Sequence, residues 1–219
     1  MIPLRSTERI YSTPAVTLTL IAINTGIFLY ELALGPYLDS FILRFGIVPD
    51  RLHLSSLLTS MFLHGGWLHL LGNMWFLWIF GKSVEDSLGH EKFLAFYFIC
   101  GVAAAVIHVL FNFYSRVPTI GASGAIAGVM GAYLIMFPRA RIVTLIPIFI
   151  FFTTLEIPAA FLLLYWFVIQ FFSGVGSIGY SQVSTGGVAW FAHVGGFLAG
   201  MLLVKLMGGR PRRYRWYVE

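Results

Sequence analysis

The chain has 219 residues, of which 58% are hydrophobic and only 11% are charged. A soluble domain is typically about half apolar and about a quarter charged, so this composition excludes an ordinary soluble domain and indicates a membrane protein. The net charge is +5, but the basic residues gather at the ends of apolar runs, which favours contact with a membrane surface over binding to nucleic acid. The single Cys100 excludes an internal disulfide.

The apolar runs predict a bundle of transmembrane helices. A spanning helix needs about 20 mostly apolar residues, so a chain of this length holds about six spans and leaves no room for a second domain. The first run, residues 15–34, follows Arg5 and Arg9. It is long enough to span and no small-x-small cleavage site follows it, so we expect a retained helix instead of a signal peptide. The expected helices cover residues 14–34, 67–82, 93–113, 122–137, 156–172 and 188–207 of a single all-α domain, 1–219.

Two connecting segments are unusual. Residues 35–66 combine prolines and charges with a more apolar stretch, which predicts a long structured loop at the membrane surface with short interfacial helices. Residues 142–172 form a run of 31 residues with almost no polarity, longer than one span. We expect 142–154 to lie in or near the inner interface and the fifth helix to begin near Glu156. A Gly/Ser-rich loop, 173–187, precedes the last helix, and a basic tail follows it.

Six spans place both termini on the same side of the membrane. If that side is the cytoplasm, it receives eleven of the fourteen Lys and Arg residues and leaves only Arg44, Arg51 and Arg116 outside. The positive-inside rule favours this orientation. The helices at 67–82, 122–137 and 188–207 then all run from outside to inside, so their first halves lie at similar depth.

Polar side chains in those first halves are the candidate functional residues, because polar groups inside apolar spans are costly. His69 and Asn73 are four residues apart and therefore share a helix face. Ser123 lies in the first turn of the fourth helix, and His193 lies early in the sixth. A serine beside a histidine base is an activated nucleophile.

Small residues allow the fourth and sixth helices to approach closely. Gly124 and Gly128 are four residues apart, and so are Gly196 and Gly200. Small-xxx-small faces let helix backbones come together in lipid. We therefore expect the fourth and sixth helices to pack through these glycines and to bring the serine and the histidine within hydrogen-bonding distance.

Three motifs together resemble those of the rhomboid family of intramembrane proteases. Residues 64–73 read HGGWLHLLGN and are similar to the family's HxxxxHxxxN stretch. Residues 121–124 read GASG and resemble its GxSG nucleophile motif, and residues 192–200 read AHVGGFLAG and match AHxxGxxxG. The motifs occur in the family's order, and the resemblance covers essentially the whole chain. The chain departs from many bacterial rhomboids in lacking a Trp-Arg pair in the first loop.

The resemblance implies a six-helix rhomboid bundle with a long outer loop between the first two helices. It also implies peptide-bond hydrolysis without a cofactor, with Ser123 as nucleophile and His193 as general base. The side chains of His69 and Asn73, with the backbone N–H of Ser123, would stabilise the oxyanion. No carboxylate is placed to orient His193, so we expect a Ser–His dyad. Possible accessory residues are His64, Gly121 and Gly124.

The implied substrates are single-span proteins in the lipid bilayer, cut near the outer face. The resemblance and the absence of a long extension or a soluble domain favour a compact prokaryotic enzyme. Its expected location is the plasma membrane, with both termini cytoplasmic.

Three alternatives to serine proteolysis fit the sequence less well. A catalytically inactive rhomboid-like protein that binds transmembrane helices would normally lack Ser123 or His193. A small transporter usually has internal repeats and a continuous path of ionisable residues, and neither is present in this sequence. Zinc catalysis is not expected, because His64 and His69 are five residues apart and no glutamate follows the first. Glu85 resembles a structural glutamate of the family and is assigned to folding.

Overall fold

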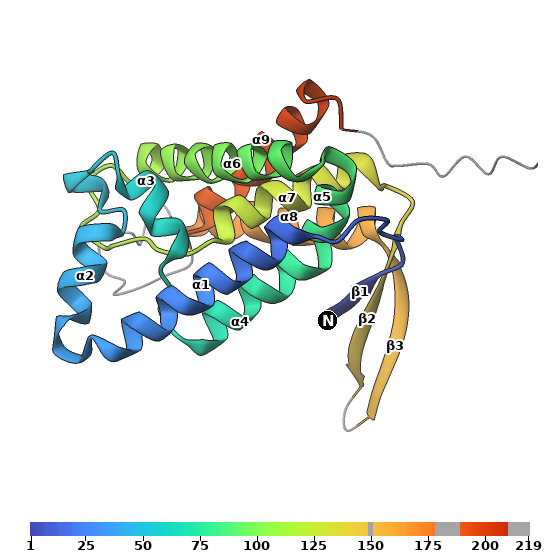
Figure 1. The fold of residues 1–219 in the computed structure, drawn as a ribbon, viewed down its shortest axis with the longest axis horizontal. Helices are drawn as coiled ribbons and strands as arrows, with labels where there is room; N and C mark the ends of the chain where they lie inside the picture. Colours follow the sequence, from blue (N-terminus) through green and yellow to red (C-terminus); the bar gives the residue numbers. More distant parts are fainter. Residues whose placement is uncertain (149–150, 178–188, 210–219) are drawn as a thin grey trace, which may run out of the picture.

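The structure, a computed structural model, describes residues 1–148, 151–177 and 189–209. Figure 1 shows a bundle of helices with a small β-sheet at one end. The presence of the sheet corrects the expectation of an all-α fold to a mostly helical one. The principal helices are α1 (Ala15–Ala33), α4 (Trp67–Phe76), α6 (His90–Phe111), α7 (Ser123–Met136), α8 (Ala159–Ser177) and α9 (Trp190–Leu206).

Three of these helices are long and apolar enough to cross a membrane by length and composition: residues 15–33, 90–111 and 159–176. Helices α7 and α9 are apolar but shorter. Helix α4 does not end where the sequence predicted. It continues through a π-helical turn, Leu77–Gly81, into α5, Lys82–Leu88, so the helix extends six residues beyond its predicted end at residue 82. The start of the last expected helix, at residue 188, lies outside the described residues.

The main error of the sequence interpretation concerns residues 141–158. They form a β-hairpin, β2 (Arg141–Ile148) and β3 (Phe151–Pro158), and β1 (Ile2–Ser6) pairs antiparallel with β2 in the order β1-β2-β3. Glu156 therefore lies in a strand, and the fifth long helix begins at Ala159. Valine, isoleucine, threonine and phenylalanine dominate the segment and favour extended backbone, and a strand from the far end of the chain completes the sheet.

Two hydrogen bonds fix the sheet to the helices. The hydroxyls of Ser6 in β1 and Tyr133 in α7 lie 2.5 Å apart. The indole N–H of Trp75 in α4 donates to the carbonyl of Pro3 at 2.6 Å. The sheet is therefore joined to two different helices of the bundle.

Helix α7 forms the centre of the bundle, and nearly all of its residues are buried. It packs against α9 through the predicted glycines. A Cβ atom on Gly196 would overlap the carbonyl oxygen of Gly124, and a Cβ on Gly200 would overlap that of Gly128. Only glycine at these two positions of α9 permits this backbone approach.

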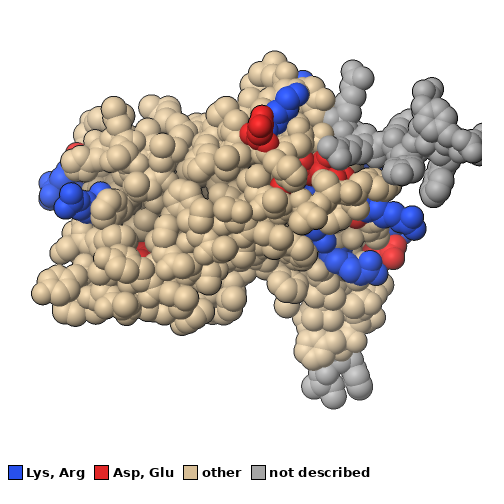
Figure 2. All heavy atoms as spheres, in the orientation of Figure 1, with Lys and Arg blue, Asp and Glu red and all other residues tan. Residues whose placement is uncertain are grey.

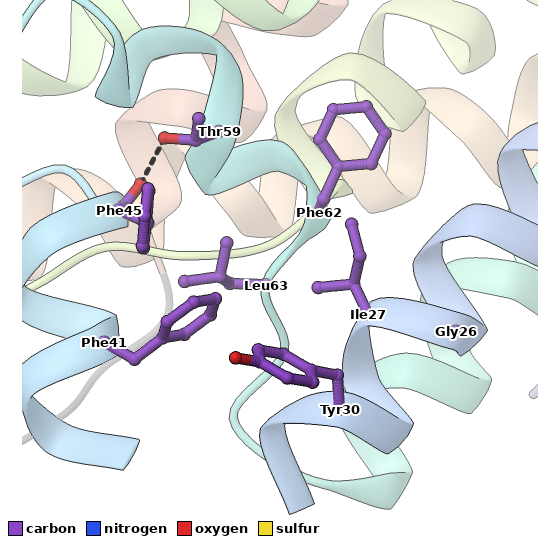
Figure 3. A pocket seen from close by; sticks show the side chains of 8 residues that line it. All are labelled: Gly26, Ile27, Tyr30, Phe41, Phe45, Thr59, Phe62 and Leu63. Carbon is purple, nitrogen blue, oxygen red and sulfur yellow. Dashed lines mark hydrogen bonds between the residues drawn. The ribbon is translucent and has the colours of Figure 1, made fainter. Parts of the chain in front are cut away.

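The segment between α1 and α4 contains short helices: α2 (Leu38–Phe45), α3 (Ser56–Thr59), and the 3-10 turns η1 (Gly35–Tyr37), η2 (Pro49–Arg51) and η3 (Ser60–Phe62). Helix α2 contacts α1 through the rings of Tyr30 and Phe41, whose centroids are 5.7 Å apart. A hollow of about 280 Å³ lies between α1, α2 and residues 59–63, and the Thr59 hydroxyl donates to the Phe45 carbonyl at 2.6 Å beside it (Figure 3). Its lining is almost entirely apolar and carries none of the candidate residues.

Glu85, which the family resemblance assigned to folding, anchors the beginning of α1. Pro14 precedes that helix and offers no side-chain cap. The Glu85 carboxylate instead accepts hydrogen bonds from the backbone N–H groups of Val16 and Thr17 at 2.8 Å and from the Thr17 hydroxyl at 2.6 Å. The His90 ring donates to the same carboxylate at 2.6 Å. A buried acceptor thereby satisfies N–H groups that have no partner within the helix.

Charged side chains leave a wide belt of the surface uncharged. On the face seen in Figure 2, most Lys, Arg, Asp and Glu side chains lie toward the two ends of the molecule, and the surface between them is uncharged except for a small acidic spot. Exposed leucines, phenylalanines and valines of α1, α6 and α8 face outward. An apolar belt between charged ends is the surface expected of a protein in a bilayer.

Candidate active site

The serine and the histidine predicted from the sequence lie side by side. Ser123 is the first residue of α7, and His193 lies near the beginning of α9. The Ser123 Oγ and His193 Nε2 atoms are 2.8 Å apart, a hydrogen-bonding distance. The close glycine packing of α7 on α9 makes this distance possible, and His193 is buried.

The backbone that leads into Ser123 is held on both sides. Thr119 pairs with Ile47 in an isolated β-bridge, and its hydroxyl lies 2.8 Å from His108 Nε2 on α6. The N–H of Gly121 donates to the carbonyl of Ser60 at 2.8 Å. Gly121 has φ of +125°, which other residues rarely adopt. These contacts fix the start of α7, where the first N–H groups have no partner within the helix.

His69 and Asn73 lie beside this turn. A Cβ atom on Gly121 would be 2.8 Å from His69 Nε2 and 3.6 Å from Asn73 Nδ2, so the glycine allows both side chains to approach the turn that precedes Ser123. The amide nitrogen of Asn73 is buried and has no hydrogen-bond partner among the described residues. His69 Nδ1 accepts from the N–H of Gly65 at 3.4 Å, which leaves the proton of the neutral ring on Nε2. Two donors therefore lie next to the start of α7.

His64 lies next to His69, at the edge of this group of polar residues. Its ring packs edge-on against His69 with centroids 5.2 Å apart, and its backbone N–H donates to the buried Glu31 carboxylate at 3.1 Å. His64 therefore contacts the His69 ring that borders the site. Gly124, the other accessory candidate, faces α6 and α9, so its part is in helix packing.

A cavity of about 1050 Å³ opens beside these residues. Its lining includes Ser123, His193, His69, Asn73 and Trp166. The volume is slightly above the usual range for ligand sites, about 300–1000 Å³. The four polar candidates thus share one cavity that can admit an extended segment of polypeptide. Among residues 1–148, 151–177 and 189–209, no three His, Cys, Asp or Glu side chains are grouped as metal ligands.

Sequence reasoning missed the residue that contacts the other nitrogen of His193. The side-chain oxygen of Gln170, on α8, lies 2.5 Å from His193 Nδ1, and Trp166 packs against the same ring with centroids 5.7 Å apart. The sequence prediction of a dyad rested on the absence of a suitably placed carboxylate, and Gln170 is not a carboxylate. Gln170 was visible by the same signal as the others, because it is a strongly polar side chain inside an otherwise apolar helix.

Comparisons with known proteins relate the chain to the members of one family. A family model described as the Rhomboid domain matches residues 51–210. Rhomboid protein 1, mitochondrial, of Saccharomyces cerevisiae is 28% identical over 75% of the chain and 42% of its own length. RHOMBOID-like protein 6, mitochondrial, of Arabidopsis thaliana is 31% identical over 71% of the chain and 44% of its length. The human Presenilin-associated rhomboid-like protein, mitochondrial, is 36% identical over 44% of the chain and 26% of its length. The chain thus spans less than half the length of these relatives.

Proposed function

This multi-pass membrane protein belongs to the rhomboid family, and we propose that it is a serine endopeptidase that cleaves transmembrane-helix substrates within the membrane. The observation that carries the proposal is the 2.8 Å contact between Ser123 Oγ and His193 Nε2 inside a cavity that also exposes Asn73 and His69. A nucleophile, a base and two oxyanion donors are the groups that acyl transfer requires.

The proposed reaction begins with proton transfer from Ser123 Oγ to His193 Nε2 while the oxygen attacks the scissile carbonyl carbon. The electron pair of the carbonyl moves onto its oxygen, and the backbone N–H of Ser123 with the side chains of Asn73 and His69 stabilise the charge. His193 then donates its proton to the leaving amine as the C–N bond breaks. A water molecule, deprotonated by His193, hydrolyses the acyl-enzyme and restores the serine.

The helical arrangement supports six spans. We propose that α4 with its continuation to Leu88, α7 and α9 cross the membrane together with the three longer helices. The basic residues favour a plasma-membrane protein with both termini cytoplasmic and the segment containing α2 and α3 outside. The beginnings of α4, α7 and α9 would then lie near the outer face, and a single-span substrate would be cut there once its helix is locally unwound.

A fluorescent fluorophosphonate probe tests the nucleophile. The full chain in detergent should be labelled, and Ser123→Ala and His193→Ala should not. Ser55→Ala, at an exposed serine, is the matched control and should be labelled like the parent chain. Cleavage of a model single-span substrate should follow the same order. Labelling of Ser123→Ala would refute the nucleophile assignment. A parent chain that binds the substrate but neither cleaves it nor reacts would indicate a binding protein instead.

Single-cysteine variants test the orientation. The native Cys100 is buried, so it gives a low background with a membrane-impermeant maleimide. A cysteine at Tyr114, which is exposed beyond the end of α6, should react in intact cells. A cysteine at Arg139, which is exposed just after the C-terminal end of α7, should react only after the membrane is permeabilised. The reverse pattern would overturn the proposed topology.

A further inference from the structure

The contact between His193 and Gln170 bears on which nitrogen of the His193 ring carries the proton. A neutral imidazole carries one proton, which lies on either Nδ1 or Nε2. Only the form with the proton on Nδ1 has a free lone pair on Nε2, the nitrogen that faces the Ser123 hydroxyl. The other form would point an N–H at the serine and could not accept its proton. The position of a single hydrogen therefore decides whether the pair can react.

The side-chain oxygen of Gln170 faces Nδ1 at 2.5 Å, and an amide oxygen can only accept a hydrogen bond. We propose that Gln170 is a positioning residue: it accepts the Nδ1–H of His193 and so keeps the Nε2 lone pair directed at Ser123. The proposal rests on the proposed proteolytic function. It extends the expected Ser–His dyad to a Ser–His–Gln arrangement.

A neutral amide suits this location better than a carboxylate. Gln170 is only 7% exposed, and the other side chains of residues 162–172 on α8 are apolar or aromatic. A buried carboxylate would need a compensating positive charge, whereas the amide needs only hydrogen-bond partners. A hydrogen bond between neutral groups orients the ring but stabilises an imidazolium less than an ionised group does. We therefore expect a smaller contribution than the aspartate of a Ser–His–Asp triad makes.

Helix α8 holds the imidazole from two directions. Gln170 contacts its edge at Nδ1, and Trp166, one turn earlier on the helix, packs against its face with an interplanar angle of 35°. Trp166 also lines the cavity. The nucleophile comes from α7, the base from α9 and the residues that orient the base from α8. A displacement of α8 would therefore release the base even if the contact between α7 and α9 were unchanged.

The test uses the full chain with Gln170→Met, which keeps the approximate volume but removes the strong acceptor. Gln170→Glu keeps an acceptor. Ile169→Met, at the adjacent and 41% exposed position, introduces the same side chain without touching His193. We expect kcat of Gln170→Met to fall about 10- to 100-fold with little change in KM, since a buried N–H loses its partner while substrate contacts remain. Gln170→Glu should retain most of kcat, with the acid limb of its pH–rate profile moved to higher pH. Ile169→Met should behave like the parent chain.

A second readout does not depend on activity. In protein labelled with ring-¹⁵N histidine, the His193 signals, assigned by their loss in His193→Ala, should show the proton on Nδ1. In Gln170→Met that preference should weaken. A proton on Nε2 in the parent chain, or parental kcat in Gln170→Met, would overturn the proposal. An equal loss of kcat in Ile169→Met would also overturn it, because the effect would then be general to helix packing. An inactive parent chain with the proton on Nδ1 would refute the protease while supporting the orientation of His193 by Gln170.

Discussion

Replacing Glu85 with glutamine should destabilise the protein without changing the chemistry of its site. The carboxylate accepts four hydrogen bonds, from Val16, from the N–H and hydroxyl of Thr17, and from His90. Glutamine keeps one oxygen and turns an N–H₂ group toward the donors of the other, so about two of the bonds are lost. A hydrogen bond to a charged group contributes about 1.5–3 kcal/mol. The expected loss is therefore about 3–6 kcal/mol of the free energy of unfolding.

The chain supplies its own probe for this measurement. Cys100 is the only cysteine, has no exposed surface and lies against Gly128 between α6 and α7. A dye that becomes fluorescent on reaction with a thiol will report the opening of that interface during heating. For a protein of this size, 1 kcal/mol moves the melting temperature by about 2–4 °C, so Glu85→Gln should melt on the order of 10 °C lower.

The matched control is Glu156→Gln, the same change at an exposed glutamate of β3. It should melt within about 2 °C of the parent chain, as surface substitutions generally do. At a temperature where both variants are folded, fluorophosphonate labelling of Ser123 should equal that of the parent. An unchanged melting temperature in Glu85→Gln would refute the capping argument. Loss of labelling without loss of stability would assign Glu85 to the chemistry instead.

Three further outcomes follow from the site and its supports. Asn73→Ala should lower kcat about 100- to 1000-fold, which is the usual cost of removing an oxyanion donor. Its melting temperature should stay near that of the parent chain. Unchanged kinetics would show that Asn73 does not stabilise the oxyanion. Gly196→Ala should abolish fluorophosphonate labelling and lower the melting temperature because the added methyl separates α7 from α9, whereas Gly26→Ala, on α1 and away from the site, where the added methyl meets no other atom within 4 Å, should do neither. Burial and a neighbouring imidazole lower the pKa of His64 to about 4. The unfolded chain therefore binds the extra proton first as the pH falls below about 6.5, and about 2 kcal/mol of stability is lost by pH 5; melting curves should show a smaller difference between pH 7.5 and pH 5 in His64→Asn than in the parent.

The candidate site could be predicted to a large extent because membrane spans make polar residues conspicuous. Ser123, His193, His69 and Asn73 stand out against long apolar runs, and the four-residue spacing of the glycines indicates which helix faces meet. The same principle would have found Gln170. Gln170 was not predicted as the partner of His193 because its side chain is not ionisable. The chemistry of a buried site favours a neutral amide there.

The β-hairpin could not be predicted in the same way. Residues 142–155 are almost uniformly apolar, so the alternation of apolar and polar residues that identifies a strand is absent. The pattern is equally compatible with a helix. The partner strand that stabilises β2 is β1, at the other end of the chain, and no local pattern reports such a pairing. Pro147 and Pro158 were the available signals, because both disfavour the interior of a helix. The helical continuation to Leu88 was missed because charged residues at a helix end resemble a loop.

The pairing of β1 with β2 also determines when the sheet can form during synthesis of the chain. Ile2 pairs with Leu145, which is synthesised 143 residues later. At about 5–20 residues per second, β1 waits roughly 7–30 s on the ribosome before its partner exists. During that interval its backbone N–H and C=O groups have no strand beside them. Sheet closure is therefore a late event of biosynthesis, and protection of β1 from a protease would mark nascent chains that have progressed past α7.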